Sequence, residues 1–152
     1  MVDVVENCKR VLGAVRRAAE RSGRDPRQIK LLAATKTQPV AAVRAALEAG
    51  VCLLGENYVQ EAQAKKEIIG DVPEWHLIGH LQRNKVRAAV GLFSIIQSLD
   101  NVRLAQLLAR EGRDRGRDVG VLVEVNLAGE RSKTGVLEEG LVPLLREVSQ
   151  LE

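Results

Sequence analysis

The chain has 152 residues, the length of a single domain, and its 45% hydrophobic and 28% charged residues are typical of a globular protein and argue against disorder. The formal net charge is +3, but basic runs such as residues 112–118 mix both signs, which indicates a solvated surface more than a nucleic-acid patch. Aromatic residues make up 2% of the chain, too few to stack the bases of single-stranded nucleic acid. We therefore expect no nucleic-acid partner.

The amino-terminal sequence has an early acidic residue and no long apolar stretch. This pattern predicts neither a signal peptide nor a membrane-spanning helix, so the cytoplasm is the expected location. Cys8 and Cys52 lie far apart and form no CxxC pair. Thiols in such positions are more often small core residues than partners in a disulfide or a metal site.

The first element that the sequence predicts is a leading helix. Apolar residues recur with helical spacing from Val4 to Ala19, and Gly23 followed by Asp25 and Pro26 ends the pattern. Beyond it, strand-like and helix-like runs alternate. Strands are predicted at 29–35, 51–57, 75–79, 92–98 and 119–126, and helices at 39–49, 58–69, 82–90, 101–111 and 138–150. Gly50, Gly91 and Gly112 stand where we expect three of these helices to stop.

This alternation predicts an α/β fold with a parallel sheet, for which an open doubly wound sheet and a (β/α)₈ barrel are the two candidates. The first strand is not followed by GxGxxG, so the dinucleotide-binding fingerprint is absent. A closed barrel needs eight strands and typically about 250 residues. We therefore expect an incomplete TIM-type barrel that contains the leading helix and the first five βα units, as a single domain over residues 1–152.

Lys36 is the first candidate functional residue. It stands directly after the apolar run 31–35 and directly before Thr37, Gln38 and Pro39, where a strand gives way to a helix. The carboxyl ends of parallel strands are where α/β proteins keep their reactive groups. The neutral amine of a lysine at such a position can form a Schiff base with an aldehyde. The alternative is a solvated loop lysine without a chemical role.

Four further residues fall at the carboxyl ends of the predicted strands: Asn57, Gly79, Ser98 and Asn126. Asn57 could supply an oriented amide, and Gly55 before it could leave room for a flat ligand. For the polar members, helix capping or turn formation is the alternative. In the fifth strand, the valines at 121, 123 and 125 should pack on helices, while the opposite face should look into the barrel.

Three other types of site are poorly supported. His76 and His80 are four residues apart but lie on a predicted strand without the glutamate of a zinc-binding HExxH helix, so we expect no metal site and a hydrogen-bonded role for both. The loop at 128–135 lacks the spacing of a phosphate-binding loop. A GxSxG elbow is absent too, so no catalytic triad is predicted.

Five blocks of sequence resemble one known family. They are AATKTQP around Lys36, GENYVQE at 55–61, WHLIGHLQRNK at 75–85, SLDN at 98–101 and VEVNLAGERSKTG at 123–135. These blocks are similar to the pyridoxal-phosphate homeostasis proteins of the YggS/PROSC type, which are relatives of the amino-terminal barrel of alanine racemase. The blocks occur in the family's order and span nearly the whole chain.

The resemblance implies a (β/α)₈ barrel that binds pyridoxal 5′-phosphate as a Schiff base on Lys36, with Asn57 beside the cofactor. It also implies a role in vitamin B6 and amino-acid homeostasis without established turnover, so no catalytic residue is expected. The alternative is a pyridoxal-phosphate-dependent racemase or lyase, which needs an acid or base on the far face of the cofactor. A third reading, a basic module that binds RNA or acidic protein, rests only on the pI of about 9.1.

The sequence departs from the family in one respect. The resemblance implies three more βα units, whose loops hold the cofactor phosphate and place an arginine at the pyridine nitrogen, and their motifs do not occur in these 152 residues. The first and fifth strands should therefore be open edges of the sheet. We expect the isolated chain to self-associate, to borrow strands from a partner or to be poorly stable.

Overall fold

The computed structural model describes residues 3–130 and 132–151. Within them, 3₁₀ turns η1 and η2 accompany the helices and strands. In chain order the elements are α1 (Val4–Arg21), η1 (Pro26–Gln28), β1 (Leu32–Ala34), α2 (Val40–Glu48), β2 (Leu53–Glu56), α3 (Val59–Ile69), β3 (Glu74–Leu77), η2 (Arg83–Lys85), α4 (Val86–Leu92), β4 (Ile95–Leu99), α5 (Val102–Asp114), β5 (Gly120–Val123) and α6 (Glu138–Val148). Every predicted strand and helix is present, with the strands shorter than predicted.

Local sequence explains several of the helix boundaries. The Asp3 carboxylate accepts a hydrogen bond from the Glu6 amide at 3.0 Å and starts α1, and Asn101 starts α5 by accepting from the Leu104 amide at 2.9 Å. Gly50 follows the end of α2 with φ of 98°, a conformation that glycine adopts without strain. The predicted stop at Gly50 is thus confirmed.

The stops predicted at Gly91 and Gly112 are wrong, because both residues lie inside helices, α4 and α5. A Cβ atom at Gly112 would lie 2.8 Å from the Arg117 carbonyl oxygen, and one at Gly91 would lie 2.9 Å from Nη1 of Arg115. Both glycines therefore allow the segment after α5 to pass close to the helices, a packing role that the local pattern does not reveal.

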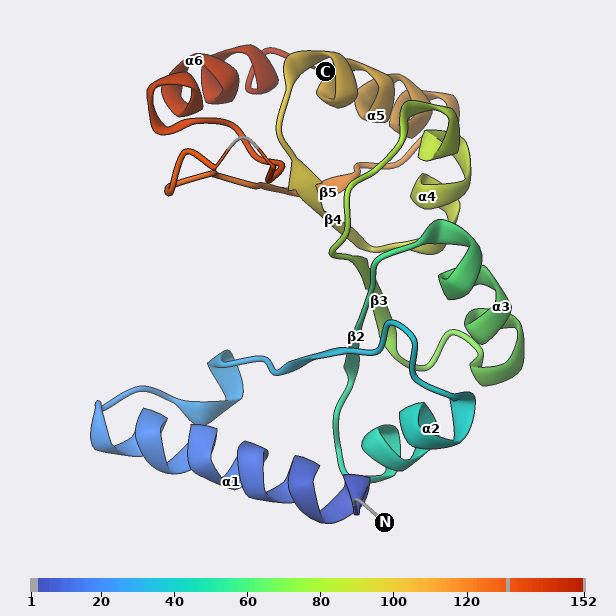
Figure 1. Ribbon diagram of the computed structural model, residues 1–152, viewed down its shortest axis with the longest axis vertical. Coiled ribbons are helices and arrows are strands. Elements are labelled where there is room, and N and C mark those ends of the chain that lie inside the picture. Colours follow the sequence, from blue (N-terminus) through green and yellow to red (C-terminus); the bar gives the residue numbers. More distant parts are fainter. Residues whose placement is uncertain (1–2, 131, 152) are drawn as a thin grey trace.

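The five strands form one parallel sheet in the order β1-β2-β3-β4-β5. Figure 1 shows helices α2 to α5 in an arc along one face of this sheet, while the opposite, inner face carries no helix layer. A doubly wound sheet would have helices on both faces and a reversal of strand order. The arrangement is instead that of a TIM-type barrel left open, as the sequence predicted.

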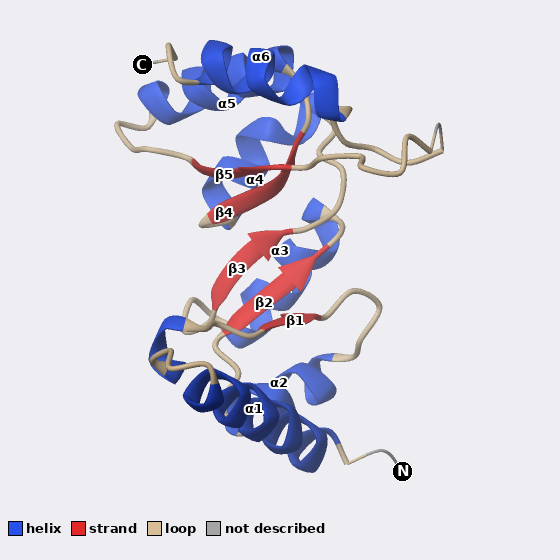
Figure 2. Ribbon diagram, turned by 90° about the vertical axis from the view of Figure 1, so that its left-hand side faces the viewer, coloured by secondary structure: helices blue, strands red, loops and turns tan. Residues whose placement is uncertain are grey.

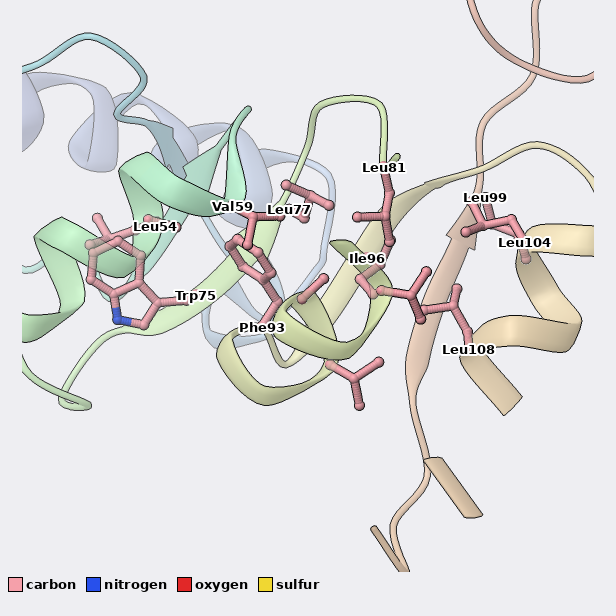
Figure 3. Packing of buried hydrophobic residues seen from close by; sticks show 14 of the residues in the cluster. Leu54, Val59, Trp75, Leu77, Leu81, Phe93, Ile96, Leu99, Leu104 and Leu108 are labelled. Atoms are coloured by element: carbon pink, nitrogen blue, oxygen red, sulfur yellow. The ribbon is translucent and has the colours of Figure 1, made fainter. Parts of the chain in front are cut away.

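The hydrophobic core lies between the sheet and the helix arc. Figure 3 shows its central side chains, which come from strands β2 to β4, from helices α3 and α5 and from the loops next to them. They include Leu54, Leu77, Ile96, Leu104, Leu108 and the aromatic pair Trp75 and Phe93. Each fully buried side chain of this size stabilises the fold by about 1.5–3 kcal/mol. This layer fixes the strand positions on which the carboxyl-end loops depend.

The predicted division of β5 into two faces is confirmed for the valines of the strand. Val121 and Val123 pack against the core, whereas the Leu122 side chain between them is 50% exposed. No helix in the described part of the chain has the length and apolar character that crossing a bilayer would require.

Candidate functional site

The carboxyl ends of the parallel strands meet at one edge of the sheet, on the right in Figure 2. The β1–β2 register pairs Ala34 with Gly55, so Lys36 and Asn57, each two residues further on, follow neighbouring strand ends at the same level. Lys36 is exposed and Asn57 is half-buried. The two residues that the sequence singled out thus lie on adjacent loops of this edge.

The space above Gly55 is not free, contrary to the sequence-based expectation. A Cβ atom at this position would lie 2.5 Å from Cδ2 of Leu32 and 3.0 Å from Cδ1 of Ile78. These two side chains, from β1 and from the residue directly after β3, close over Gly55 on the inner face and would have to move to admit a side chain there.

An ion network lies behind Lys36, on the side of the sheet that the helices cover. The Glu56 carboxylate accepts hydrogen bonds from the Thr35 hydroxyl at 2.6 Å and from Nζ of Lys65 at 2.7 Å. Lys65 also donates to the Thr35 carbonyl oxygen at 2.5 Å and to Oε1 of Glu61 at 2.8 Å. The same Glu61 oxygen accepts from the Thr37 amide at 2.6 Å. The residues before and after Lys36 are therefore both held from α3.

The network is buried and charged. The Glu56 side chain is 0% exposed and that of Lys65 is 8% exposed. Burial opposes the charge of Lys65, but its hydrogen bonds to Glu56 and Glu61 outweigh burial and raise its pKa above the ordinary value. The hydrogen bond from Lys65 lowers the pKa of Glu61. Lys65 and Glu61 consequently remain an ion pair at neutral pH.

Thr37 has φ of 61°. Among the residues that the structure describes, it is the only one other than glycine with a positive φ. A β-branched residue in this left-handed region costs on the order of 1–3 kcal/mol and persists where its surroundings hold it. Here the holding contact is the bond from the Thr37 amide to Glu61. The backbone next to Lys36 is thus kept in a conformation that it would not adopt alone.

Sequence reasoning missed this network, although two signals for it were present. Glu56 interrupts the otherwise apolar run of β2, and a buried carboxylate needs a partner. Glu61 and Lys65 are four residues apart on a predicted helix, so they share one face. What the sequence did not indicate is that this face packs against the loop that carries Lys36.

Of the other residues predicted at this edge, Asn126 and Gly79 have local structural roles. The Asn126 side chain donates to the Glu130 carbonyl oxygen at 2.9 Å and so folds its own loop. Ser98 is 1% exposed within β4 and does not reach the surface. Gly79 is needed because a Cβ atom there would lie 2.5 Å from the Asn57 carbonyl oxygen. The turn-forming alternative is therefore confirmed for Asn126.

The hydrogen-bonded role predicted for His76 is confirmed. Its Nε2 bonds to Glu74 at 3.1 Å, and its Nδ1 accepts from Gln97 at 2.8 Å. The bond from His76 is also the main reason why the pKa of Glu74 is lowered. His80 is exposed on the loop after β3. Within residues 3–130 and 132–151, no group of three or more His, Cys, Asp or Glu side chains is arranged to hold a metal ion.

A hollow of about 370 Å³ opens beside Asn57, a size within the range of small-molecule sites. Tyr58, His80, Gln82 and Lys85 contribute to its lining, which contains no carboxylate, and Lys36 does not border it. The hollow therefore offers hydrogen-bond donors and one cation at the second strand end, next to the Lys36 loop.

Comparison with known proteins gives consistent matches. The profile of the family described as "Alanine racemase, N-terminal domain" matches residues 12–152. The pyridoxal phosphate homeostasis proteins of Pseudomonas aeruginosa and Aquifex aeolicus are 41% and 38% identical to the chain, over 99% of its length and 66% of theirs. The chain thus spans just under two thirds of the length of these curated relatives.

Among solved structures, an unknown protein from Bifidobacterium adolescentis is 34% identical with a TM-score of 0.88, over 99% of this chain and 65% of that one. PipY of Synechococcus elongatus, solved with PLP bound, is 36% identical with a TM-score of 0.77, over 91% of this chain and 65% of that one. An alanine racemase from Clostridium difficile, at 16% identity and a TM-score of 0.69 over 82% of this chain and 33% of that one, shares the fold.

Proposed function

Because this chain belongs to the alanine racemase N-terminal domain family, we propose that it is a pyridoxal 5′-phosphate-binding protein of vitamin B6 and amino-acid homeostasis, with the cofactor held as a Schiff base on Lys36. The observation that carries the proposal is the exposed primary amine of Lys36 at the carboxyl end of β1, level with Asn57. A relative that is 36% identical, PipY, has been solved with PLP bound.

The residues present fit the aldehyde end of this cofactor. Pyridoxal phosphate supplies an aldehyde that condenses with an amine and a ring that withdraws electrons. Lys36 supplies the amine, and the Asn57 amide supplies donors and an acceptor on the adjacent loop. Leu32 and Ile78 close the floor beneath them over Gly55. The family resemblance assigns the phosphate and the pyridine nitrogen to three further βα units, whose motifs do not occur in these 152 residues, so the residues present supply the attachment half of the site.

We propose that the chain has no turnover of its own, consistent with relatives named homeostasis proteins. Racemisation or elimination would need a second acid or base opposite Lys36. The sequence offers no evident candidate, and Tyr58, the single tyrosine, has a side chain that is 63% exposed beside Asn57. A racemase or lyase therefore remains the rival that the experiment must exclude.

Three further properties belong to the same proposal. Residues 1–152 form one domain, which corresponds to the amino-terminal part of an alanine-racemase-like barrel. The location is cytoplasmic, in keeping with two free thiols, Cys8 and Cys52. The partner is the cofactor, not a nucleic acid, because basic runs of the sequence such as residues 112–118 also contain acidic residues.

Borohydride reduction of the chain after incubation with pyridoxal phosphate tests this function. We expect a cofactor mass on the peptide that contains Lys36, and loss of that adduct in Lys36→Ala. Lys9→Ala, which removes an exposed lysine of α1, is the matched control and should keep it. Incubation of the same samples with L-alanine should yield no D-alanine in chiral analysis. Equal labelling of both variants would refute attachment at Lys36, and Lys36-dependent D-alanine would establish the racemase.

A further inference from the structure

We propose that Glu61 and Lys65 of α3 are positioning residues for Lys36, which hold the backbone on both sides of it so that its amine faces the cofactor. This inference rests on the proposed function, and it goes further by assigning a role to a helix that lies behind the site. The two side chains share one face of α3, one helical turn apart, and reach residues on either side of Lys36.

The contacts define a clamp with two arms, one from each residue. Lys65 Nζ binds the carbonyl oxygen of Thr35, and Oε1 of Glu61 binds the amide of Thr37, while the two side chains bind each other at 2.8 Å. Glu56 of β2 also binds Nζ of Lys65, at 2.7 Å, so the lysine bridges two glutamates. Each backbone group next to Lys36 is thus bonded to an ionised side chain, and such bonds are shorter and stronger than neutral ones.

The same contacts also determine the direction of the Lys36 side chain. Thr35 is 4% exposed and its hydroxyl is bonded to Glu56, so its side chain lies on the helix-covered side. Lys36 is the next residue and its side chain is exposed. The positive φ of Thr37 then turns the chain back toward α2. Without the bond to Glu61, this strained turn would relax, and the amine of Lys36 would lose its fixed direction.

Substitutions at Glu61 test the clamp, because this side chain is 25% exposed and its loss leaves the Glu56–Lys65 pair in place. Glu61→Ala removes the acceptor for the Thr37 amide, whereas Glu61→Gln keeps an acceptor oxygen and loses only the charge. Glu67→Ala removes an exposed glutamate of the same helix and is the matched control.

Two measurements on the full chain test the clamp and its positioning role separately from the proposed function. The first is hydrogen exchange of the Thr37 amide without cofactor, which we expect to be about tenfold faster or more in Glu61→Ala, since one charge-assisted bond is lost. The second is the equilibrium constant and the rate of Schiff-base formation with pyridoxal phosphate, both followed by visible absorbance. We expect both to fall about tenfold in Glu61→Ala, to recover largely in Glu61→Gln and to stay unchanged in Glu67→Ala.

The outcomes are distinct. An unchanged rate of hydrogen exchange at the Thr37 amide in Glu61→Ala would overturn the clamp, whether or not Schiff-base formation changes. Faster exchange with an unaltered Schiff base would make the clamp merely structural and would overturn the positioning role. If the unsubstituted chain gives no Schiff base on Lys36, the proposed function fails and the positioning role fails with it, while exchange still reports whether the clamp exists.

Discussion

At the scale of single residues, the Glu56–Lys65 pair shows how burial and charge are reconciled next to the site. Removing two charges from water costs several kcal/mol for each ion, which mutual attraction offsets only with good geometry and further hydrogen bonds. Here Lys65 has three acceptors, Thr35, Glu56 and Glu61. Oε2 of Glu56, by contrast, has no hydrogen-bond partner among the residues that the structure describes. The lysine of the pair therefore has a full set of hydrogen-bond acceptors, whereas one oxygen of the glutamate has no donor among the described residues.

This asymmetry predicts the cost of breaking the pair. Lys65→Met leaves the Glu56 carboxylate buried without a counter-ion and should destabilise the chain by about 3–5 kcal/mol. The double variant Glu56→Gln, Lys65→Met removes both charges and should recover most of that loss. Urea unfolding followed by circular dichroism measures both variants. An equal loss in the single and double variants would mean that the hydrogen bonds from Lys65 to Thr35 and Glu61, not the unpaired charge of Glu56, account for the stabilisation.

At the scale of elements, α3 is docked on the ends of β1 and β2 through polar contacts as well as through the core. Val59 and Ala62 bury its apolar side, while Glu61 and Lys65 bind the β1 loop. An amphipathic helix usually keeps its charges toward water. In α3 two of them turn inward, so the position of the Lys36 loop depends on side chains of this helix.

The docking of α3 should depend on pH in the acid range. The pKa of Glu61 is lower in the folded chain than its usual value of 4.5, so the unfolded state binds its proton first as the pH falls. The stabilising contribution of Glu61 is therefore complete above about pH 4.5 and is lost as the pH falls through the lowered pKa of the folded state. Glu61→Gln should flatten this part of the stability profile in urea titrations between neutral and acid pH. If stability falls just as steeply with acid in Glu61→Gln, the loss of stability would be due to other carboxylates, Glu74 first among them.

At the scale of the whole molecule, the open barrel exposes surface that a closed barrel covers. In the described sheet, β1 and β5 are the edge strands. Leu122 on the inner side of β5 and Leu127 after it are 50% and 79% exposed. An unpaired edge next to apolar side chains is a template for pairing with another chain. We expect this edge to pair with a second copy of the chain.

We predict that the 152-residue chain by itself self-associates in a concentration-dependent way. Leu122→Glu places an inward-pointing charge beside the open edge and should weaken association by like-charge repulsion. Size-exclusion chromatography with light scattering over a range of concentrations measures this, with Leu145→Glu on the exposed side of α6 as control. A compact monomer that unfolds cooperatively at every concentration would refute the prediction.

The sequence by itself determined the order of the elements, the barrel-type architecture and the place of Lys36 and Asn57 at neighbouring strand ends. These features follow from apolar periodicity and from the geometry of parallel strands, which act over a few residues. The tertiary structure alone decided what surrounds them. Thr35 and Thr37 meet Lys65 and Glu61 across 30 and 24 residues of chain, and Leu32 reaches the space above Gly55 from another strand. Such contacts depend on which helix face packs against which strand end, and a local pattern carries no information about that choice.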